Sequence, residues 1–351
     1  MNITTVGVDL AKDLITVYAA DELGRMVSVR DLRRREFAAW LVQLPAGCVF
    51  GMEACSSAHY WARRMIELGL VPKLMAADFV QPFRKSRATK NDRNDAEAIC
   101  TAVRQPNMRF VTVKSVEQQT RLAWHRVREG FKEERTATIN RTRGLLAEFG
   151  IVIGKSTRAF HRALADLICD EAQPESLRRL LERLKMQLTM LDEQMTACDT
   201  QVAQQARASE SAKRIQEIAG VGPLTADAII STVGDAHEFK NGRQFAAWQG
   251  LTPRQYSSGG KTKLGRITRR GDAYLRTLLI QGARSTLQAA MKRAPDKLTR
   301  IQQWMIALVA RVGYHKTLVA IANKHARMIW AILAKGEDFN INAWQQYQAG
   351  V

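Results

Sequence analysis

The chain has 351 residues, of which 53 are lysine or arginine and 34 are aspartate or glutamate, so its formal net charge is +19. This length allows two or three domains with a buried core, and the charge indicates a polyanionic partner, most simply a nucleic acid. An anionic membrane is the rival partner, but no apolar run reaches the roughly 20 residues of a spanning helix, and the N-terminus lacks a signal-peptide pattern. Five widely spaced cysteines and six scattered histidines support neither a disulfide framework nor a zinc site, and they favour a reduced, cytoplasmic compartment.

The first 112 residues have the pattern of an α/β layer. Apolar segments predict strands at 3–10, 14–20, 26–30, 47–53 and 71–75, and helices at 34–44, at 57–68 and from about residue 92. Three successive strands followed by alternating helices and strands are typical of a mixed sheet with helices packed on it.

Four acidic residues occupy unusual places in this pattern. Asp9 lies within an apolar strand, Glu53 ends the fourth strand, and Asp92 and Asp95 are three residues apart at the start of a helix, so the last two share one side of it. A charge in an apolar strand is costly unless it is paired or metal-bound. If the fold brings the four together, their repulsion requires a cation, and ligation by oxygen alone selects Mg²⁺ or Mn²⁺. Two such ions can clamp both sides of a phosphodiester displacement. The alternative is that each acid is a turn, flanking or capping residue.

The middle segment, 113–210, is predicted to be helical, with helices at 117–149, at 157–170 and after Pro174. In the last of these, apolar residues alternate in steps of four and three, which predicts a coiled coil. The seam consists of Leu177, Leu181, Leu184, Leu188, Leu191, Met195, Cys198 and Val202. Its narrow, regular form favours self-association, and a hairpin with the preceding helix is the alternative. The basic part of the first helix, 121–143, either lines a nucleic acid or is a solvated face.

The last segment, 211–351, is predicted to be mainly α-helical. Residues 214–230 have the form of a helix-hairpin-helix whose turn contains Gly220 and Gly222, and its backbone N–H groups suit a phosphate. A purely structural turn is the alternative. Further helices are expected at 239–250, 272–290, 301–312 and 316–335.

Between two of these helices, Ser257 and Ser258 precede a Gly-Gly pair in a strongly cationic stretch. Ten cations and a single acid, Asp272, lie between residues 240 and 285. Glycines let the backbone approach a phosphate closely, cations neutralise its charge, and a serine held there is a candidate nucleophile toward a phosphodiester. A surface turn with a solvated basic face is the alternative. The candidate nucleic-acid-binding residues of the whole chain are Lys90, Arg93, Arg141, Arg143, Gly220, Gly222, Arg254, Lys261, Lys263, Arg266, Arg269, Arg270 and Arg276.

The order of the acids on the strand pattern resembles an RNase H-like domain of the RuvC type, and further motifs carry a wider resemblance. These motifs are Gly7-Val-Asp-Leu-Ala-Lys12, Gly51-Met-Glu53, Lys90-Asn-Asp-Arg-Asn-Asp-Ala96, Ile218-Ala-Gly-Val-Gly-Pro223, Gly250-Leu-Thr-Pro-Arg-Gln-Tyr-Ser-Ser-Gly-Gly-Lys261, Leu264-Gly-Arg-Ile267 and Gly271-Asp-Ala-Tyr-Leu-Arg276. In this order, over nearly the whole chain, they resemble the DEDD transposases of bacterial insertion sequences, which are bridge-RNA-guided serine recombinases.

The resemblance implies a RuvC-like DEDD domain at 1–112, a helical coiled-coil linker at 113–210 and a C-terminal transposase domain with the catalytic serine at 211–351. It implies that Asp9, Glu53, Asp92 and Asp95 bind Mg²⁺, with Mn²⁺ as a substitute. The serine of the family directly precedes a glycine, which selects Ser258 and leaves Ser257 as the second choice. The implied partners are donor and target DNA, a structured guide RNA and further copies of the chain, as a dimer or tetramer, acting on the nucleoid in the bacterial cytoplasm.

The expected function is therefore cutting and rejoining of DNA through a serine nucleophile and metal-binding acids, guided by an element-encoded RNA. Two alternatives remain open. One is a metal-dependent nuclease of the Holliday-junction type, in which water attacks and the serine loop only grips phosphate. The other is a nucleic-acid-binding protein without catalytic activity.

Overall fold

The computed structural model of the chain describes residues 3–85 and 91–340. The chain divides into two compact units, Met1–Glu117 and Gln118–Val351. In the described ranges, no helix combines the length and the apolar character needed to cross a membrane. All five cysteines lie in these ranges and are free thiols.

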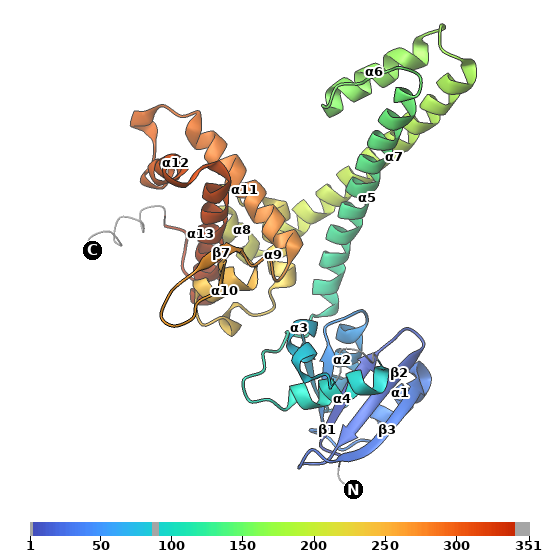
Figure 1. Cartoon of the computed structure of the whole chain (residues 1–351), viewed down its shortest axis with the longest axis vertical. Helices are drawn as coiled ribbons and strands as arrows, with labels where there is room; N and C mark the ends of the chain where they lie inside the picture. The colour runs from blue at the N-terminus through green and yellow to red at the C-terminus, as the bar shows by residue number, and fades with distance from the viewer. Residues whose placement is uncertain (1–2, 86–90, 341–351) are drawn as a thin grey trace. The chain divides into compact units, whose positions relative to one another are not determined.

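The first unit contains a five-stranded mixed sheet in the order β3-β2-β1-β4-β5 (Figure 1). β1 pairs with β4 and β4 with β5 in parallel, whereas β2 is antiparallel to both β1 and β3. The elements are β1 (Thr5–Leu10), β2 (Leu14–Ala20), β3 (Met26–Arg33), α1 (Arg34–Leu41), β4 (Val49–Glu53), α2 (Ala58–Glu67), β5 (Val71–Met75), α3 (Ala77–Val80), the 3₁₀ turn η1 (Gln81–Phe83) and α4 (Asp92–Val103). The prediction of a mixed α/β sheet is confirmed.

The two faces of this sheet follow the alternation of side chains along β1 and β4. Val8 of β1 and Met52 of β4 are fully buried in a core shared with α1 and α2. The intervening Gly7 and Gly51 face the other way, because a Cβ atom on either would meet α4. Helix α4 can lie directly on the sheet because these two positions have no side chain. Its main chain comes so close that a Cβ on Gly7 would lie 2.1 Å from the carbonyl oxygen of Ala96.

We expect Gly7→Ala to destabilise the first unit by about 1–3 kcal/mol, since the added methyl must push α4 off the sheet. Urea unfolding of the full chain, followed by far-UV circular dichroism, measures the change. Gly130→Ala is the matched control, because Gly130 lies within a helix and a Cβ there meets nothing within 4 Å. Its midpoint should stay the same or rise slightly. Equal midpoints for Gly7→Ala and the wild type would contradict the close packing of α4.

Up to residue 340, the second unit is helical apart from one two-stranded hairpin, and this confirms the predicted helical remainder. Its elements are α5 (Val116–Ala147), α6 (Thr157–Cys169), α7 (Glu175–Ala208), α8 (Glu210–Gln216), α9 (Pro223–Thr232), η2 (Ala236–Glu238), α10 (Gly242–Trp248), β6 (Pro253–Gln255), β7 (Leu264–Ile267), α11 (Ala273–Met291), η3 (Pro295–Lys297), α12 (Arg300–Val312) and α13 (Tyr314–Lys335). The sequence pattern did not predict the β6–β7 hairpin, which stands where a loop was expected.

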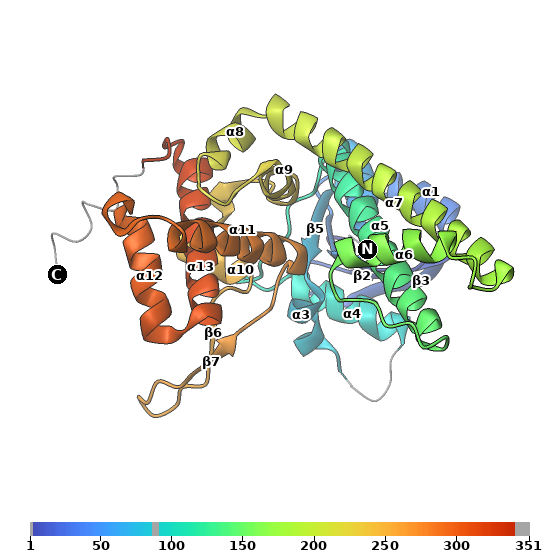
Figure 2. The same cartoon turned by 90° about the horizontal axis from the view of Figure 1, so that it is seen from above.

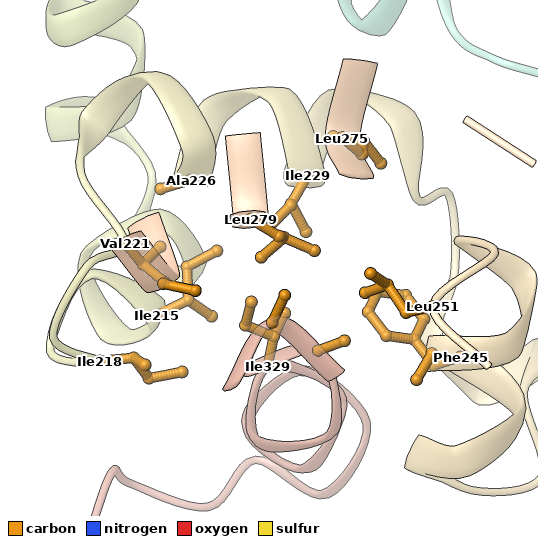
Figure 3. Close-up of a cluster of buried hydrophobic side chains, with 14 of the residues drawn as sticks. Ile215, Ile218, Val221, Ala226, Ile229, Phe245, Leu251, Leu275, Leu279 and Ile329 are labelled. Atoms are coloured by element: carbon orange, nitrogen blue, oxygen red, sulfur yellow. The ribbon is translucent and has the colours of Figure 1, made fainter. Parts of the chain in front are cut away.

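The core of this unit collects side chains from α8 through α13 (Figure 3). Ile215 and Ile229 pack with Phe245, Leu279 and Ile329, all of which are buried. The chain from 212 to 332 is therefore held by one continuous apolar cluster, and the β6–β7 hairpin extends from it.

The heptad seam of α7 packs within the chain. Leu177, Leu181 and Leu188 are buried together with apolar residues of α5 and α6, namely Ile139, Leu146, Phe160 and Leu164. α5 and α7 run side by side in both views (Figures 1 and 2), and ion pairs between Arg128 and Asp199 and between Arg135 and Asp192 join them. The seam was predicted either to mediate self-association or to pack against the preceding helix. At these positions it packs within the chain.

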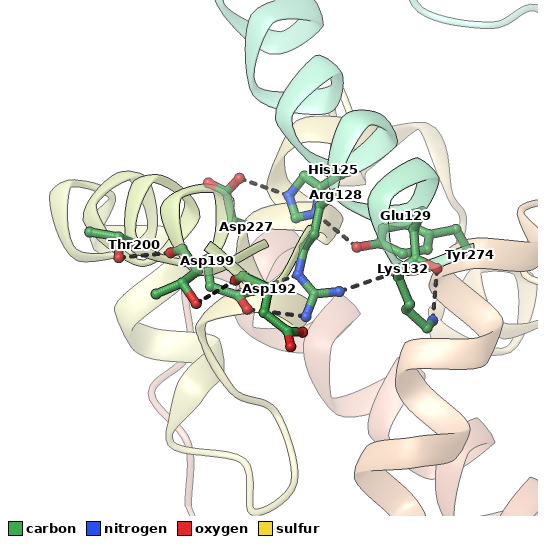
Figure 4. A network of polar contacts seen from close by, with 10 residues as sticks. His125, Arg128, Glu129, Lys132, Asp192, Asp199, Thr200, Asp227 and Tyr274 are labelled. Carbon is green, nitrogen blue, oxygen red and sulfur yellow. Dashed lines mark hydrogen bonds and ion pairs between the residues drawn. The ribbon is translucent and has the colours of Figure 1, made fainter. Parts of the chain in front are cut away.

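A buried polar network attaches the first turns of α5 to α9 and α11 (Figure 4). His125 Nε2 lies 3.0 Å from Asp227 Oδ2, and His125 Nδ1 lies 3.0 Å from the Tyr274 hydroxyl. A carboxylate only accepts hydrogen bonds, so Nε2 donates to Asp227, while Nδ1 shares a hydrogen bond with the Tyr274 hydroxyl. Arg121 pairs with the other oxygen of Asp227 at 3.3 Å. Burial, followed by the negative charge of Glu129, raises the pKa of Tyr274, so its hydroxyl stays protonated.

Candidate active site

Three of the four predicted acids gather on the α4 side of the sheet. Val8 pairs with Met52 between the parallel strands β1 and β4, and the next residues along these strands are Asp9 and Glu53. Asp9 lies two residues after Gly7, and Glu53 lies two residues after Gly51. Because side chains alternate between the two faces of a sheet, both carboxylates project toward α4, as the two glycine positions do. Asp95 lies in the first turn of α4 and is 7% exposed. The ends of two parallel strands and the start of the helix that covers them therefore place these carboxylates near one another.

The electrostatics of a neighbouring thiol agree with this placement. Cys55 follows β4, and its pKa is raised first by desolvation and then by the negative charges of Glu53 and Asp9. Both carboxylates therefore act on the same point beyond the strand ends.

A cation of the chain itself lies between two of the acids. The guanidinium group of Arg84, just after η1, places Nη2 3.4 Å from Glu53 Oε1 and Nε 3.0 Å from Asp95 Oδ1. The charge of Arg84 offsets the repulsion between carboxylates that the fold has brought together. Arg84 was not among the residues singled out from the sequence.

Asp92 begins α4 one turn before Asp95 and is exposed. The helix is capped by Asn91, whose side chain accepts from the Arg93 N–H at 2.9 Å, so Asp92 does not serve as the N-cap. Its carboxylate is on the same side of the helix as Asp95, but the ion pairs of Arg84 are with Glu53 and Asp95.

The carboxylates fit a hard divalent cation in their chemistry. All the ligands they offer are oxygens, which Mg²⁺ and Mn²⁺ prefer, and Arg84 shows that one positive group reaches both Glu53 and Asp95. Over residues 3–85 and 91–340, no three His, Cys, Asp or Glu side chains lie close enough together to hold a metal ion. A metal ion would therefore draw the carboxylates inward around it.

The serine pair lies at the tip of the β6–β7 hairpin in the second unit. The Lys261 N–H donates to the Ser258 carbonyl at 3.0 Å, and Gly259 and Gly260 between them have φ values of 55° and 75°. Two positive φ values inside a hydrogen-bonded four-residue turn are typical of type I′, which favours glycine at both central positions. The Gly-Gly pair therefore closes the hairpin and places Lys261 opposite Ser258.

The two serine hydroxyls have different roles in this turn. Ser257 Oγ accepts from Gln255 Nε2 at 2.9 Å and from the Lys263 backbone N–H at 3.3 Å, so it holds the two arms of the hairpin together. Among the residues described, the Ser258 hydroxyl has no hydrogen-bond partner. It is exposed on a turn that the hydrogen bond from the Lys261 N–H to the Ser258 carbonyl closes.

The hairpin and its base carry an exposed cationic surface. The exposed cations are Arg254, Lys261, Lys263, Arg266, Arg269 and Arg270. Tyr256 stands among them with a side chain that is 62% exposed. An exposed two-stranded ribbon with cations and an aromatic ring suits a nucleic-acid strand. Tyr256 was not among the nucleic-acid-binding residues predicted from the sequence. An aromatic residue in a cationic stretch with few apolar residues is a signal that could have identified it as one.

Three other arginines predicted to bind nucleic acid form ion pairs or hydrogen bonds within the chain. Arg93 pairs with Asp31 at 2.7 Å, Arg143 donates to the carbonyls of Gly154 and Lys155, and Arg276 donates to the Gln249 carbonyl at 3.1 Å.

The glycines of the α8–α9 turn also differ in their surroundings. The turn packs on α11 so closely that a Cβ on Gly220 would lie 2.5 Å from the Gly282 carbonyl oxygen, whereas Gly222 faces open space. Arg141 is exposed on α5. Lys90 lies outside the described residues.

Comparisons with known proteins identify the family of the chain. The family model described as transposase of the IS116/IS110/IS902 family matches residues 212–298, and a transposase model named for DEDD and IS110 matches residues 6–151. A probable family 20 transposase of Pseudomonas aeruginosa is 41% identical over 338 residues, which cover 95% of this chain and 98% of that protein.

Two further relatives are transposases of named elements. The transposase for insertion sequence element IS1111A of Coxiella burnetii is 38% identical, with 97% of this chain and 93% of that protein covered. The transposase for element IS1328 of Yersinia enterocolitica is 35% identical, with 97% and 99% covered. The chain therefore belongs to the IS110/IS116 family of insertion-sequence transposases.

Proposed function

We propose that this transposase cuts and rejoins DNA with Ser258 as nucleophile and with a divalent metal ion, Mg²⁺ or Mn²⁺, held by Asp9, Glu53, Asp95 and Asp92. We also propose that the first unit is an RNase H-like domain of the RuvC type, because its acids lie at the ends of adjacent parallel strands and on the covering helix. The observation that carries the serine assignment is the exposed Ser258 hydroxyl, which has no hydrogen-bond partner among the described residues and lies on a hydrogen-bonded turn opposite Lys261.

The proposed reaction has two transesterification steps. Ser258 Oγ attacks the phosphorus of a DNA phosphodiester, a P–Oγ bond forms, and one P–O ester bond to a sugar breaks; the serine hydroxyl gives up its proton, and the leaving sugar oxygen gains one, so no net proton is consumed. A hydroxyl of a second DNA end then attacks the same phosphorus and releases Ser258. Because each step exchanges one phosphate ester for another, rejoining needs no ATP. When bound, the metal ion supplies Lewis-acid stabilisation of charge on the phosphate oxygens.

The residues of the chain support this reaction through charge and position. Lys261 and Lys263 neutralise a phosphate that approaches the hairpin tip, and Arg266, Arg269 and Arg270 attract the adjoining backbone. Guidance by a structured RNA of the element is part of the proposal. The net charge of +19 offers binding capacity for both nucleic acids.

The proposed assembly is a dimer or tetramer. Since the α7 seam is covered within the chain, copies are expected to meet through other surfaces.

A denaturing gel tests the proposed function. Purified protein is incubated with Mg²⁺, the RNA encoded at the element end and a labelled donor-end DNA, and the sample is denatured before electrophoresis. A denaturant-resistant protein–DNA adduct supports the serine mechanism. Cleaved DNA without an adduct indicates that water attacks, as in a metal-dependent nuclease. Bound but intact DNA in every combination of RNA, metal and substrate contradicts the catalytic proposal.

A further inference from the structure

Arg84 occupies the place where the acidic residues need a positive charge. Its guanidinium spans Glu53 and Asp95, which come from a strand end and a helix start far apart in the sequence, and the Arg84 side chain is 33% exposed. The Nε atom is buried and lies 3.0 Å from Asp95 Oδ1 without hydrogen-bond geometry toward any described residue. Charge rather than directed hydrogen bonding therefore holds the group against Asp95.

Arg84 and a metal ion compete for the same oxygens. Mg²⁺ binds carboxylate oxygens at about 2.0–2.1 Å and keeps several waters around it. The guanidinium, at 3.0–3.4 Å from Glu53 and Asp95, fills the space that such a hydrated ion needs. A fixed positive charge so close to both ligands also repels a divalent cation.

We propose that Arg84 is the resident counter-ion of the carboxylate site, which holds Glu53 and Asp95 in place without metal and must withdraw when the metal binds. This inference rests on the proposed metal-binding role of the acids. It makes Arg84 a positioning residue that sets the metal concentration at which the site fills. Arg84 directly follows the 3₁₀ turn η1, so it belongs to neither β4 nor α4, the elements that carry Glu53 and Asp95.

The test is calorimetric titration of the DNA-free full chain with Mn²⁺. We expect Arg84→Gln to bind Mn²⁺ at least about tenfold more tightly than the wild type, since the competing charge is gone. Its thermal midpoint without metal should fall, because the carboxylates then repel each other, and Mn²⁺ should raise that midpoint more than it raises the wild-type midpoint.

Lys85→Gln is the matched control. It removes one positive charge from the adjacent residue, whose ammonium pairs with Glu97 at 2.6 Å and contacts neither Glu53 nor Asp95. Its Mn²⁺ affinity should equal that of the wild type. Asp95→Asn should abolish the heat of Mn²⁺ binding, which would show that the heat comes from this site. If Arg84→Gln does not fold, Arg84→Lys replaces it in the test. Lysine keeps the positive charge on a shorter side chain, so this variant should show a smaller gain in Mn²⁺ affinity.

The outcomes separate this inference from the proposed function. If the wild type binds Mn²⁺ and Arg84→Gln binds it equally or more weakly, the counter-ion role is wrong and the metal site stands. If neither protein binds Mn²⁺, the metal-binding role of the acids fails, and the counter-ion role fails with it. The adduct formed by Ser258 is measured independently of both.

Discussion

Ser258→Ala should reduce the protein–DNA adduct and strand joining by at least about 10³-fold, since removing a catalytic nucleophile costs this much or more. DNA binding should be unchanged, because the hydroxyl contributes nothing to the turn: the Lys261 N–H bonds to the Ser258 carbonyl, which alanine keeps. Adduct yield on a denaturing gel and joined product on a sequencing gel measure the effect.

Ser257→Ala is the matched control on the same hairpin. It removes the acceptor for Gln255 Nε2 and the Lys263 N–H, so the hairpin loosens and the rate falls modestly, but the adduct still forms. The reverse result, with the adduct lost in Ser257→Ala and kept in Ser258→Ala, would reassign the nucleophile. If both variants still form the adduct, neither serine is the nucleophile.

Asp227→Ala should lower the free energy of unfolding by about 3–5 kcal/mol, as removal of one partner of a buried ion pair typically does. The substitution leaves Arg121 and His125 without the carboxylate that both contact in a site where Asp227 is fully buried. Since whole domains are stable by only about 5–15 kcal/mol, much of the second unit's stability would go. Urea unfolding measured by tryptophan fluorescence gives the value.

The chain contains its own control for this prediction. Asp235 also pairs with a histidine, His237, at 2.7 Å, but both side chains are more than half exposed. Asp235→Ala removes the same type of pair from the surface and should change the unfolding midpoint little. Asp227→Asn keeps the volume and one acceptor for His125, so it should be less harmful than Asp227→Ala. Equal midpoints for Asp227→Ala and Asp235→Ala would show that the network does not stabilise the fold.

The alternating and apolar patterns predicted the first unit well, because β1, β2, β4 and β5 each contain buried apolar residues. The same reasoning placed Asp9 within the first strand and Glu53 at the end of the fourth, and the alternation of side chains along each strand explains why both face α4. The packing of α4 depends on Gly7 and Gly51, which appear in the sequence only as small residues. Arg84 could not be inferred from local pattern, since its position depends on how the chain turns after β5.

Other features lay beyond sequence reasoning for physical reasons. β6 and β7 are three and four residues long and lack apolar alternation, so the hairpin depends on its Gly-Gly turn and on hydrogen bonds across it. The heptads of α7 indicated an apolar seam but not which helices cover it. His125 and Asp227 are 102 residues apart, and nothing in either local sequence marks them as partners.

The two arginine–aspartate pairs between α5 and α7 have a consequence for how these helices find their alignment. Heptad seams can slip by seven residues and still bury their leucines. Arg128 and Arg135 are one heptad apart, as are their partners Asp199 and Asp192. A shift of α7 by one heptad in one direction would place Lys185 opposite Arg135. The same shift in the other direction would place Ala206 opposite Arg128. In each pair the aspartate is nearly half exposed, so the pair adds little stability. Together the two pairs make the observed alignment the only one of the three in which both arginines meet an acid.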